Sequence, residues 1–233
     1  MRNFFQLVSA LLAAGLLLFS TATIAAENTL DLGDGLSVRV LYFEPENATT
    51  PPPLAILLSG GLNNEFMARA QFWLGKEMIN RGWAIVVPMT DQGRDFFIEH
   101  SSLMGGIVAQ LHERYSIKAQ KPLLLGISSG GSAALAIATQ NPADYLGVVA
   151  TPGRLLEEIP LQELDGLPIF LRVGERDDFR WNKKLEENER LLVNAGAKVD
   201  AALVPDAHHI FTLDWDEIEI WLQTVLQSGP VGL

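Results

Sequence analysis

Gly126-Ile127-Ser128-Ser129-Gly130 is the stretch of sequence that decides the fold. It follows an apolar, strand-like run at 123–125 and precedes an alanine-rich, helix-like run at 131–138. A strand, the pattern Gly-x-Ser-x-Gly and a helix together form a nucleophile elbow, a sharp turn that strains the serine and exposes its hydroxyl. The glycines on either side leave room where side chains would collide. A glycine-rich chain can contain this pattern by chance, so the rest of the sequence must support it.

Two later predicted strands end in loops that carry acids and histidines. The apolar strand at 167–173 leads into a polar loop that contains Asp177 and Asp178. The strand after it leads into a loop that contains His208 and His209. Serine, acid and histidine therefore occur in this order, each at the C-terminal end of a predicted strand. We expect the three strand ends to converge, so that an imidazole can deprotonate the serine.

Strand-like and helix-like runs alternate along most of the chain. Several strands are continuously apolar, which is typical of strands covered on both faces. The alternation predicts an α/β fold with a doubly wound, mostly parallel sheet and helices on both faces. The expected strands are 36–42, 54–58, 83–87, 123–125, 146–150, 167–173 and 198–204, and the expected helices are 66–81, 103–115, 131–138, 181–195 and 215–226.

Three details of this prediction concern element ends and insertions. We expect the helix at 66–81 to stop at Gly82, a natural helix C-cap, and the next strand to close at Pro88. The segment between 150 and 167 is too short for a cap domain, and residues 154–159 have room for a small helix at most. The site should therefore be rather open, without a large cap.

The first 26 residues have the pattern of a secretory signal peptide. Arg2 provides a positive start, a mostly apolar stretch follows, and small residues precede Ala26. Cleavage after Ala26 leaves residues 27–233, a single domain of 207 residues in the periplasm or outside the cell. We then expect no membrane span. The alternative is an uncleaved membrane anchor, because residues 4–26 are nearly long enough to cross a bilayer.

The chain is acidic and contains no cysteine. Its formal net charge is −11, and removal of the segment with Arg2 makes it −12. This charge gives no support for binding to nucleic acid or anionic lipid. Without cysteine, disulfides, thiolate metal sites and cysteine nucleophiles are excluded. His208 and His209 have no further ligands at metal-binding spacing, so we expect neither a metal nor a cofactor.

The combination of motifs resembles the α/β-hydrolase superfamily, and its layout is most similar to dienelactone-hydrolase-like proteins and small carboxylesterases. The resemblance covers residues 54–226 and is fairly specific for fold but only weakly specific for substrate. It rests on Leu58–Asn63, Gly126–Gly131, Val173–Asp177 and Ala207–Phe211. It implies an exported serine hydrolase that cleaves a small carboxylic ester or thioester through an acyl-enzyme intermediate.

The resemblance also implies a role for each candidate residue. Ser128 would be the nucleophile, Asp177 would orient the histidine, and His209 would take the serine proton and return it to the leaving group. The spacing from the preceding glycine favours Asp177 over Asp178. The phenylalanine two residues further on favours His209 over His208. Both neighbours remain open as alternatives at this stage.

An oxyanion hole needs two backbone N–H donors aimed at the developing negative charge. The resemblance assigns one of them to Ser129, directly after the nucleophile, and the other to Gly61 or Leu62 in the loop after strand 54–58. The chain departs from the family at Ser59, where histidine is frequent. This departure makes the shape of the loop less certain, although the donors themselves are backbone groups.

Two other functions are compatible with these motifs. One is a peptidase, because related folds also cleave amides, but the lack of a propeller or large cap disfavours it. The other is a non-catalytic binding protein on a hydrolase scaffold, because fold does not fix function. Ser59 and the choice between two histidines leave that second alternative open.

Overall fold

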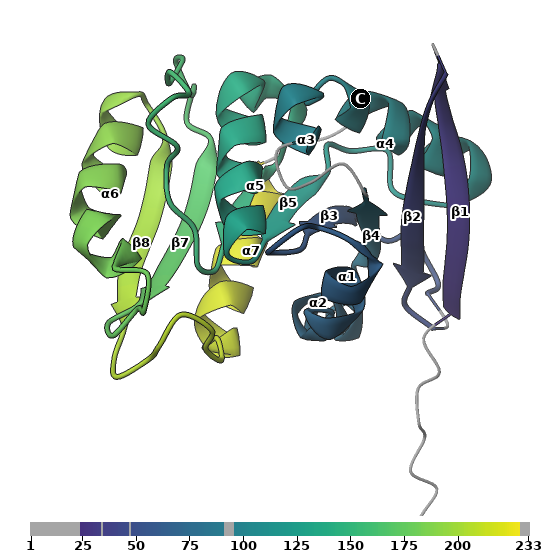
Figure 1. Cartoon of the computed structure of the whole chain (residues 1–233). Coiled ribbons are helices and arrows are strands. Elements are labelled where there is room, and N and C mark those ends of the chain that lie inside the picture. The colour runs from purple at the N-terminus through teal and green to yellow at the C-terminus, as the bar shows by residue number, and fades with distance from the viewer. Residues whose placement is uncertain (1–23, 34, 47, 91–95, 229–233) are drawn as a thin grey trace, which may run out of the picture.

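The computed structural model describes residues 24–33, 35–46, 48–90 and 96–228. In these ranges, eight strands form one sheet in the order β1-β2-β4-β3-β5-β6-β7-β8 (Figure 1). The pairs β1–β2 and β2–β4 are antiparallel, and every other pair is parallel. The strands are β1 (Ile24–Gly33), β2 (Leu36–Glu44), β3 (Leu54–Leu58), β4 (Ala84–Met89), β5 (Leu123–Gly126), β6 (Gly147–Ala150), β7 (Pro168–Gly174) and β8 (Lys198–Val204).

The helices cover both faces of this sheet. The described α-helices are α1 (Glu65–Ala70), α2 (Trp73–Asn80), α3 (Phe96–Glu99), α4 (Leu103–Arg114), α5 (Ser129–Gln140), α6 (Leu185–Asn194) and α7 (Trp215–Ser228), with short 3₁₀ helices η1 (Pro142–Asp144) and η2 (Trp181–Lys184). Side chains of α4, α5 and α6 share one buried cluster, and side chains of α2 and α7 share another. The predicted doubly wound, mostly parallel α/β fold is confirmed.

Strand β3 shows why continuously apolar strands predicted this architecture. Leu54, Ile56 and Leu58 belong to the first cluster, whereas Ala55 and Leu57 belong to the second. Because successive side chains of a strand point to opposite faces, an apolar run without alternation is buried on both sides. The strand therefore sits at the centre of the core, and its C-terminal end leads into the loop that begins at Ser59.

The predicted helix at 66–81 is wrong in one respect, because it is two helices rather than one. Helix α1 ends at Ala70 and α2 begins at Trp73. At the break, the side-chain oxygen of Gln71 accepts a hydrogen bond from the backbone N–H of Gly60, at 2.6 Å. The interruption turns Gln71 toward the loop after β3. The expected end near Gly82 is present, since α2 stops at Asn80 and Gly82 has a positive φ of 83°.

Pro88 was expected to close its strand, but it lies inside β4, which continues to Met89. The parallel ladder between β4 and β3 stops at Val86. Beyond that residue β4 pairs with the antiparallel strand β2, in which Val40 lies opposite Pro88. Because the β3 ladder has ended there, Pro88 needs no N–H donor on that side of the strand, and its ring is tolerated.

The remaining predictions concern the connections and the N-terminus. Residues 154–159 form no helix, and no large cap is present in the described residues. Most of the predicted signal peptide falls at residues 1–23, outside the described residues, so it stays a prediction. Ile24–Ala26 are the first residues of β1, a strand that the sequence analysis did not anticipate. Among the described residues, no helix is long and apolar enough to cross a membrane.

Candidate active site

The turn between β5 and α5 holds Ser128 in a backbone conformation that non-glycine residues rarely adopt, with φ 59° and ψ −124°. Close backbone packing explains the two flanking glycines. A Cβ atom on Gly126 would lie 2.2 Å from the carbonyl oxygen of Gly130, and one on Gly130 would lie 2.1 Å from that of Leu58. Both positions therefore require glycine. The strained turn presents the serine hydroxyl at the C-terminal end of β5.

Three side chains from distant parts of the chain form a continuous hydrogen-bonded series at this point. The Oγ atom of Ser128 lies 2.7 Å from Nε2 of His209, and Nδ1 of His209 lies 2.6 Å from Oδ2 of Asp177. The side chains of His209 and Asp177 are 9% and 0% exposed. When Nδ1–H donates to the carboxylate, Nε2 is left as the acceptor that faces the serine hydroxyl.

The backbone of the loop after β7 fixes the carboxylate of Asp177. Its second oxygen, Oδ1, accepts hydrogen bonds from the backbone N–H groups of Phe179 at 2.9 Å and Trp181 at 3.2 Å. Both oxygens of the buried carboxylate therefore have partners. This arrangement leaves the carboxylate one orientation, which in turn sets the plane of the His209 ring.

A glycine allows the acid loop and the histidine loop to approach each other. A Cβ atom on Gly174 would lie 2.0 Å from the carbonyl oxygen of His208. Just beyond, the backbone N–H of Arg176 donates to the carbonyl oxygen of Ala207 at 2.8 Å. The two loops thus continue the pairing of β7 with β8 past the strand ends. This contact is the structural reason for a glycine three residues before Asp177.

Aromatic rings pack against the His209 imidazole. The ring centroid of Phe179 lies 4.5 Å away with an interplanar angle of 69°, and that of Trp181 lies 4.9 Å away at 87°. Both contacts are edge-to-face, the arrangement that aromatic quadrupoles favour. Trp181 is half-buried, whereas Phe179 is 67% exposed. The two rings restrict the movement of the imidazole between Asp177 and Ser128.

The alternative acid and histidine form a second pair on the surface. Nδ1 of His208 lies 3.1 Å from Oδ1 of Asp178, and their side chains are 65% and 60% exposed. This hydrogen bond holds the pKa of Asp178 below its ordinary value of 3.8. Neither side chain is hydrogen-bonded to Ser128. The structure therefore brings His209 to the serine and Asp177 to His209, rather than their neighbours.

The loop after β3 lies directly against the nucleophile elbow, as an oxyanion hole requires. The hydroxyl of Ser129 donates to the carbonyl oxygen of Gly61 at 3.2 Å. A Cβ atom on Gly60 would lie 3.0 Å from the Cβ of Ser128. Ser129 is the first residue of α5, so its backbone N–H has no partner within the helix. Since the N–H of Gly60 is bound to Gln71, Gly61 and Leu62 remain the candidates for the second donor.

Asn63 has a structural role in this loop that the sequence motifs do not indicate. It is buried and has a positive φ of 54°. Its side-chain oxygen accepts hydrogen bonds from the backbone N–H of Ser59 at 3.1 Å and from the Ser59 hydroxyl at 2.7 Å. Serine at position 59 thus anchors the loop through Asn63. An asparagine two residues after a pair of glycines was the available signal, because asparagine tolerates positive φ better than most residues.

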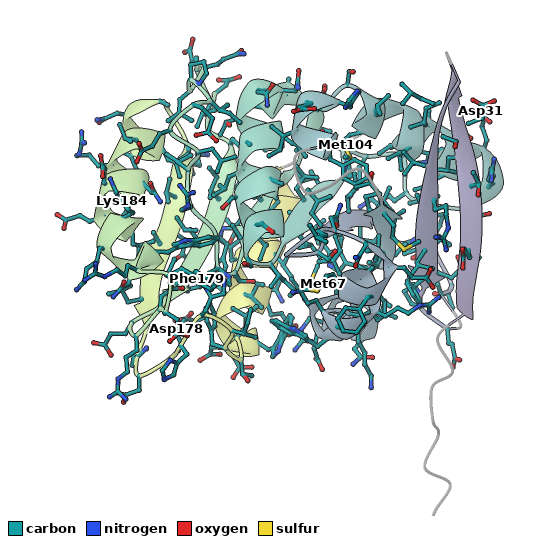
Figure 2. The ribbon with its side chains drawn as sticks, in the orientation of Figure 1. Asp31, Met67, Met104, Asp178, Phe179 and Lys184 are labelled. Atoms are coloured by element: carbon teal, nitrogen blue, oxygen red, sulfur yellow. The ribbon has the colours of Figure 1, made fainter. Side chains whose placement is uncertain are left out.

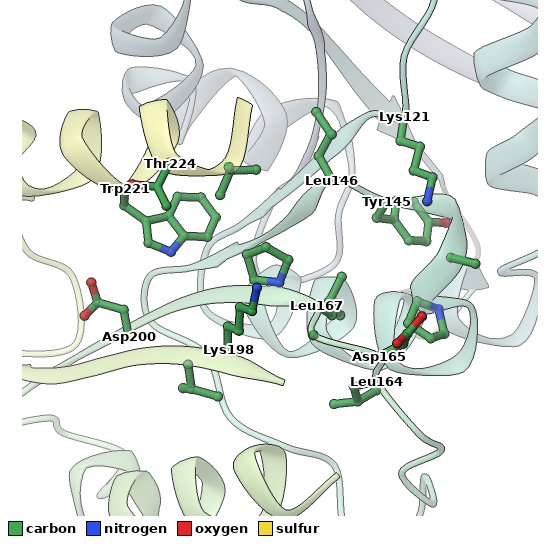
Figure 3. A pocket seen from close by; sticks show the side chains of 16 residues that line it. Lys121, Tyr145, Leu146, Leu164, Asp165, Leu167, Lys198, Asp200, Trp221 and Thr224 are labelled. Atoms are coloured by element: carbon green, nitrogen blue, oxygen red, sulfur yellow. The ribbon is translucent and has the colours of Figure 1, made fainter. Parts of the chain in front are cut away.

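The described ranges contain no candidate metal site, and one cavity lies far from Ser128. Those ranges contain no group of three or more histidine, aspartate or glutamate side chains placed to hold a metal ion. A cavity of about 570 Å³ lies at the N-terminal ends of β6, β7 and β8 (Figure 3). Ser128 follows the C-terminal end of β5, so the two lie at opposite ends of the parallel strands. Lys121, Tyr145, Lys198 and Trp221 are among its lining residues. It makes no contribution to the hydrogen-bonded series.

Comparison with solved structures places this arrangement in a known fold. A dienelactone hydrolase from Anabaena variabilis superposes with a TM-score of 0.60 and 16% identity, over 88% of this chain and 96% of that chain. A carboxylesterase from Bacillus cereus gives 0.61 and 17%, over 82% and 94%. A phospholipase/carboxylesterase from Dyadobacter fermentans gives 0.59 and 20%, over 87% and 99%.

The similarity is visible in three dimensions rather than in the sequence. No protein-family model matches this chain, and no curated protein matches it by sequence. The structural matches nevertheless cover most of this chain and nearly all of each of the three proteins. The protein therefore has the α/β-hydrolase fold, in a compact form that resembles dienelactone hydrolases and carboxylesterases.

Proposed function

We propose that this protein is a serine hydrolase that cleaves a carboxylic ester or thioester through an acyl-enzyme on Ser128. The observation that carries the proposal is the hydrogen-bonded series from Ser128 through His209 to Asp177. Its three members stand at the C-terminal ends of β5, β8 and β7, next to a glycine loop suited to an oxyanion hole. The esterases among the similar structures support the same class of reaction.

In the first half of the reaction, the Oγ of Ser128 attacks the substrate carbonyl carbon while His209 Nε2 takes the hydroxyl proton. The backbone N–H of Ser129, with that of Gly61 or Leu62, stabilises the negative charge on the carbonyl oxygen. Asp177 stabilises the imidazolium. The bond to the leaving oxygen or sulfur then breaks, and Nε2 returns the proton to that atom. The products are a free alcohol or thiol and an acyl group on Ser128.

The second half repeats these steps with water. His209 takes a proton from a water molecule, whose oxygen attacks the acyl carbon. The bond to Ser128 then breaks, and the serine oxygen recovers a proton from Nε2. The products are the carboxylic acid and the original enzyme. Every proton is carried by one imidazole nitrogen, so the fixed orientation of His209 matters for both halves.

The test compares the wild-type protein with Ser128→Ala on p-nitrophenyl acetate. The variant lacks the nucleophile, so we expect kcat to fall by a factor of about 10⁴ to 10⁶. A fluorophosphonate probe should label the wild type at Ser128 and leave the variant unlabelled. Thermal unfolding of both proteins provides the control for folding. A wild-type protein that neither turns over acyl substrates nor reacts with the probe, while it retains a bound ligand, would instead be a binding protein.

A further inference from the structure

Two exposed apolar residues adjoin His209, one in space and the other in sequence. Phe179 is 67% exposed although its ring contacts the His209 imidazole, and Ile210, the residue that follows His209, is 52% exposed. Figure 2 shows Phe179 and Asp178 on the side of β7 and β8, across from Met67 of α1. Exposed side chains of this size leave apolar surface in water, which a bound apolar group would cover.

The backbone of Phe179, rather than its side chain, performs the structural task at this position. Its N–H donates to Asp177, and any residue other than proline supplies that donor. The aromatic ring is therefore not required to orient the carboxylate. Its contact with the imidazole restricts the movement of that ring, but it does not account for an aromatic residue that is 67% exposed.

The chemistry of the reaction says which part of a substrate lies here. His209 Nε2 must deliver its proton to the leaving oxygen, so that oxygen has to come within hydrogen-bond distance of Nε2. The group attached to the leaving oxygen then lies next to the residues around the imidazole. Among these residues, Phe179 and Ile210 are exposed, whereas Asp177 is buried and Trp181 is half-buried.

Ile210 also lines a cleft, although Ser128, His209 and Phe179 do not. The cleft has a volume of about 460 Å³ and lies between α2 and the beginning of α7. Three of its lining residues are aromatic, and the lining comprises Trp73, Lys76, Glu77, Ile210, Phe211, Thr212 and Trp215. Its lining combines four apolar residues with three polar ones, so an apolar group bound there would lie against the aromatic rings.

We propose that the leaving group of the substrate is apolar, either an aryl group or an alkyl group of several carbons, and that Phe179 and Ile210 bind it. This inference rests on the proposed hydrolase function and adds the substrate class to it. The ring of Phe179 and the branched side chain of Ile210 cover the leaving group while His209 protonates its oxygen. These two residues do not specify the acyl part of the substrate.

The experiment uses two acetates that differ in the apolar size of the alcohol but have alcohols of similar acidity, ethyl acetate and benzyl acetate. We expect the wild type to prefer benzyl acetate in kcat/KM by roughly tenfold or more. Phe179→Ala and Ile210→Ala should each lower kcat/KM for benzyl acetate about fivefold more than for ethyl acetate, mainly through KM. The matched control is Ile220→Ala, because Ile220 is 68% exposed on α7 and should leave the preference unchanged.

The results separate this inference from the proposed function. A wild-type protein that hydrolyses both acetates without preference overturns the inference and leaves the hydrolase function intact. If Phe179→Ala slows both acetates by the same factor through kcat, the ring only shields the Asp177–His209 hydrogen bond, and the inference also fails. If neither acetate is hydrolysed and the fluorophosphonate does not label Ser128, the hydrolase function and the inference fall together.

Discussion

The pairs Asp177–His209 and Asp178–His208 consist of the same residue types, adjacent in the sequence, yet their surroundings differ. In the first pair the side chains are 0% and 9% exposed and 2.6 Å apart. In the second they are 60% and 65% exposed and 3.1 Å apart. A hydrogen bond out of water is stronger and holds its partners in one orientation, whereas an exposed ion pair is screened and contributes little. Burial, rather than residue type, distinguishes the two pairs.

The connection to the serine is the second difference. His209 has one ring nitrogen on the acid and the other on Ser128 Oγ, so Nε2 can exchange a proton with the serine while Asp177 holds Nδ1–H. The exposed pair, Asp178 and His208, has no hydrogen bond to Ser128. If burial and this connection define the catalytic pair, matched substitutions in the two pairs should differ widely in effect.

The largest difference is expected between the histidines. His209→Gln removes the group that accepts and returns the serine proton, so we expect kcat/KM for p-nitrophenyl acetate to fall by a factor of about 10⁴ or more. His208→Gln removes a surface hydrogen bond, and kcat/KM should stay within about twofold of the wild type. Steady-state kinetics on both variants measure this. Equal losses in the two variants would abolish the distinction between the pairs.

The acids should show a similar but smaller contrast. Asp177→Asn keeps the size of the side chain but favours the wrong histidine tautomer and no longer stabilises the imidazolium. We expect kcat to fall by roughly 10³ to 10⁴. Asp178→Asn should change kcat by less than about twofold. Should the Asp178 variant be the more damaged, the acid would have to be reassigned. Thermal unfolding of both variants shows whether a loss comes from misfolding.

The smallest effect concerns the exposed pair and pH. The hydrogen bond between Asp178 and His208 lowers the pKa of Asp178 below 3.8 in the folded protein. A lowered carboxyl pKa stabilises the folded state above the unfolded-state pKa, and the contribution disappears as the pH falls through the folded-state value. We therefore expect wild type to be slightly more stable than Asp178→Asn at pH about 6, with the difference lost at pH about 2. Urea unfolding at both pH values tests this. A difference that grows in acid has the wrong sign.

Much of the fold could be predicted because local sequence carries it. Leu54–Leu58 is predicted to be a strand buried on both faces, because every side chain in it is apolar. Such a strand needs a layer of helices on each side of the sheet. The glycines at 126 and 130 indicate a turn too tight for side chains. The two errors at Gln71 and Pro88 have one origin. In both cases the local structure depends on a segment distant in the sequence. Gln71 binds the loop after β3, and Pro88 lies beyond the point where the pairing of β4 with β3 ends.

The candidate site was predictable only in part for the same reason. Sequence spacing reduced the acid and the histidine to two neighbours each. It gave no role to Asn63, whose side chain holds Ser59 inside the loop. Hydrogen bonds of this kind form between groups that come together only in the folded chain. A residue's type limits which bonds it can make, but its surroundings decide which of them it does make.

By itself, the sequence determined the alternating strands and helices, the strained serine turn and the order of the three candidate residues, because these depend on side-chain periodicity and on where glycine is required. The tertiary structure decided that His209 faces Ser128 and that Asp177 faces His209, although the histidine and the serine are 81 positions apart in the chain. The register of β7 with β8 and the absence of a side chain at Gly174 set that geometry. Such contacts depend on the close packing of distant segments, which no local pattern specifies.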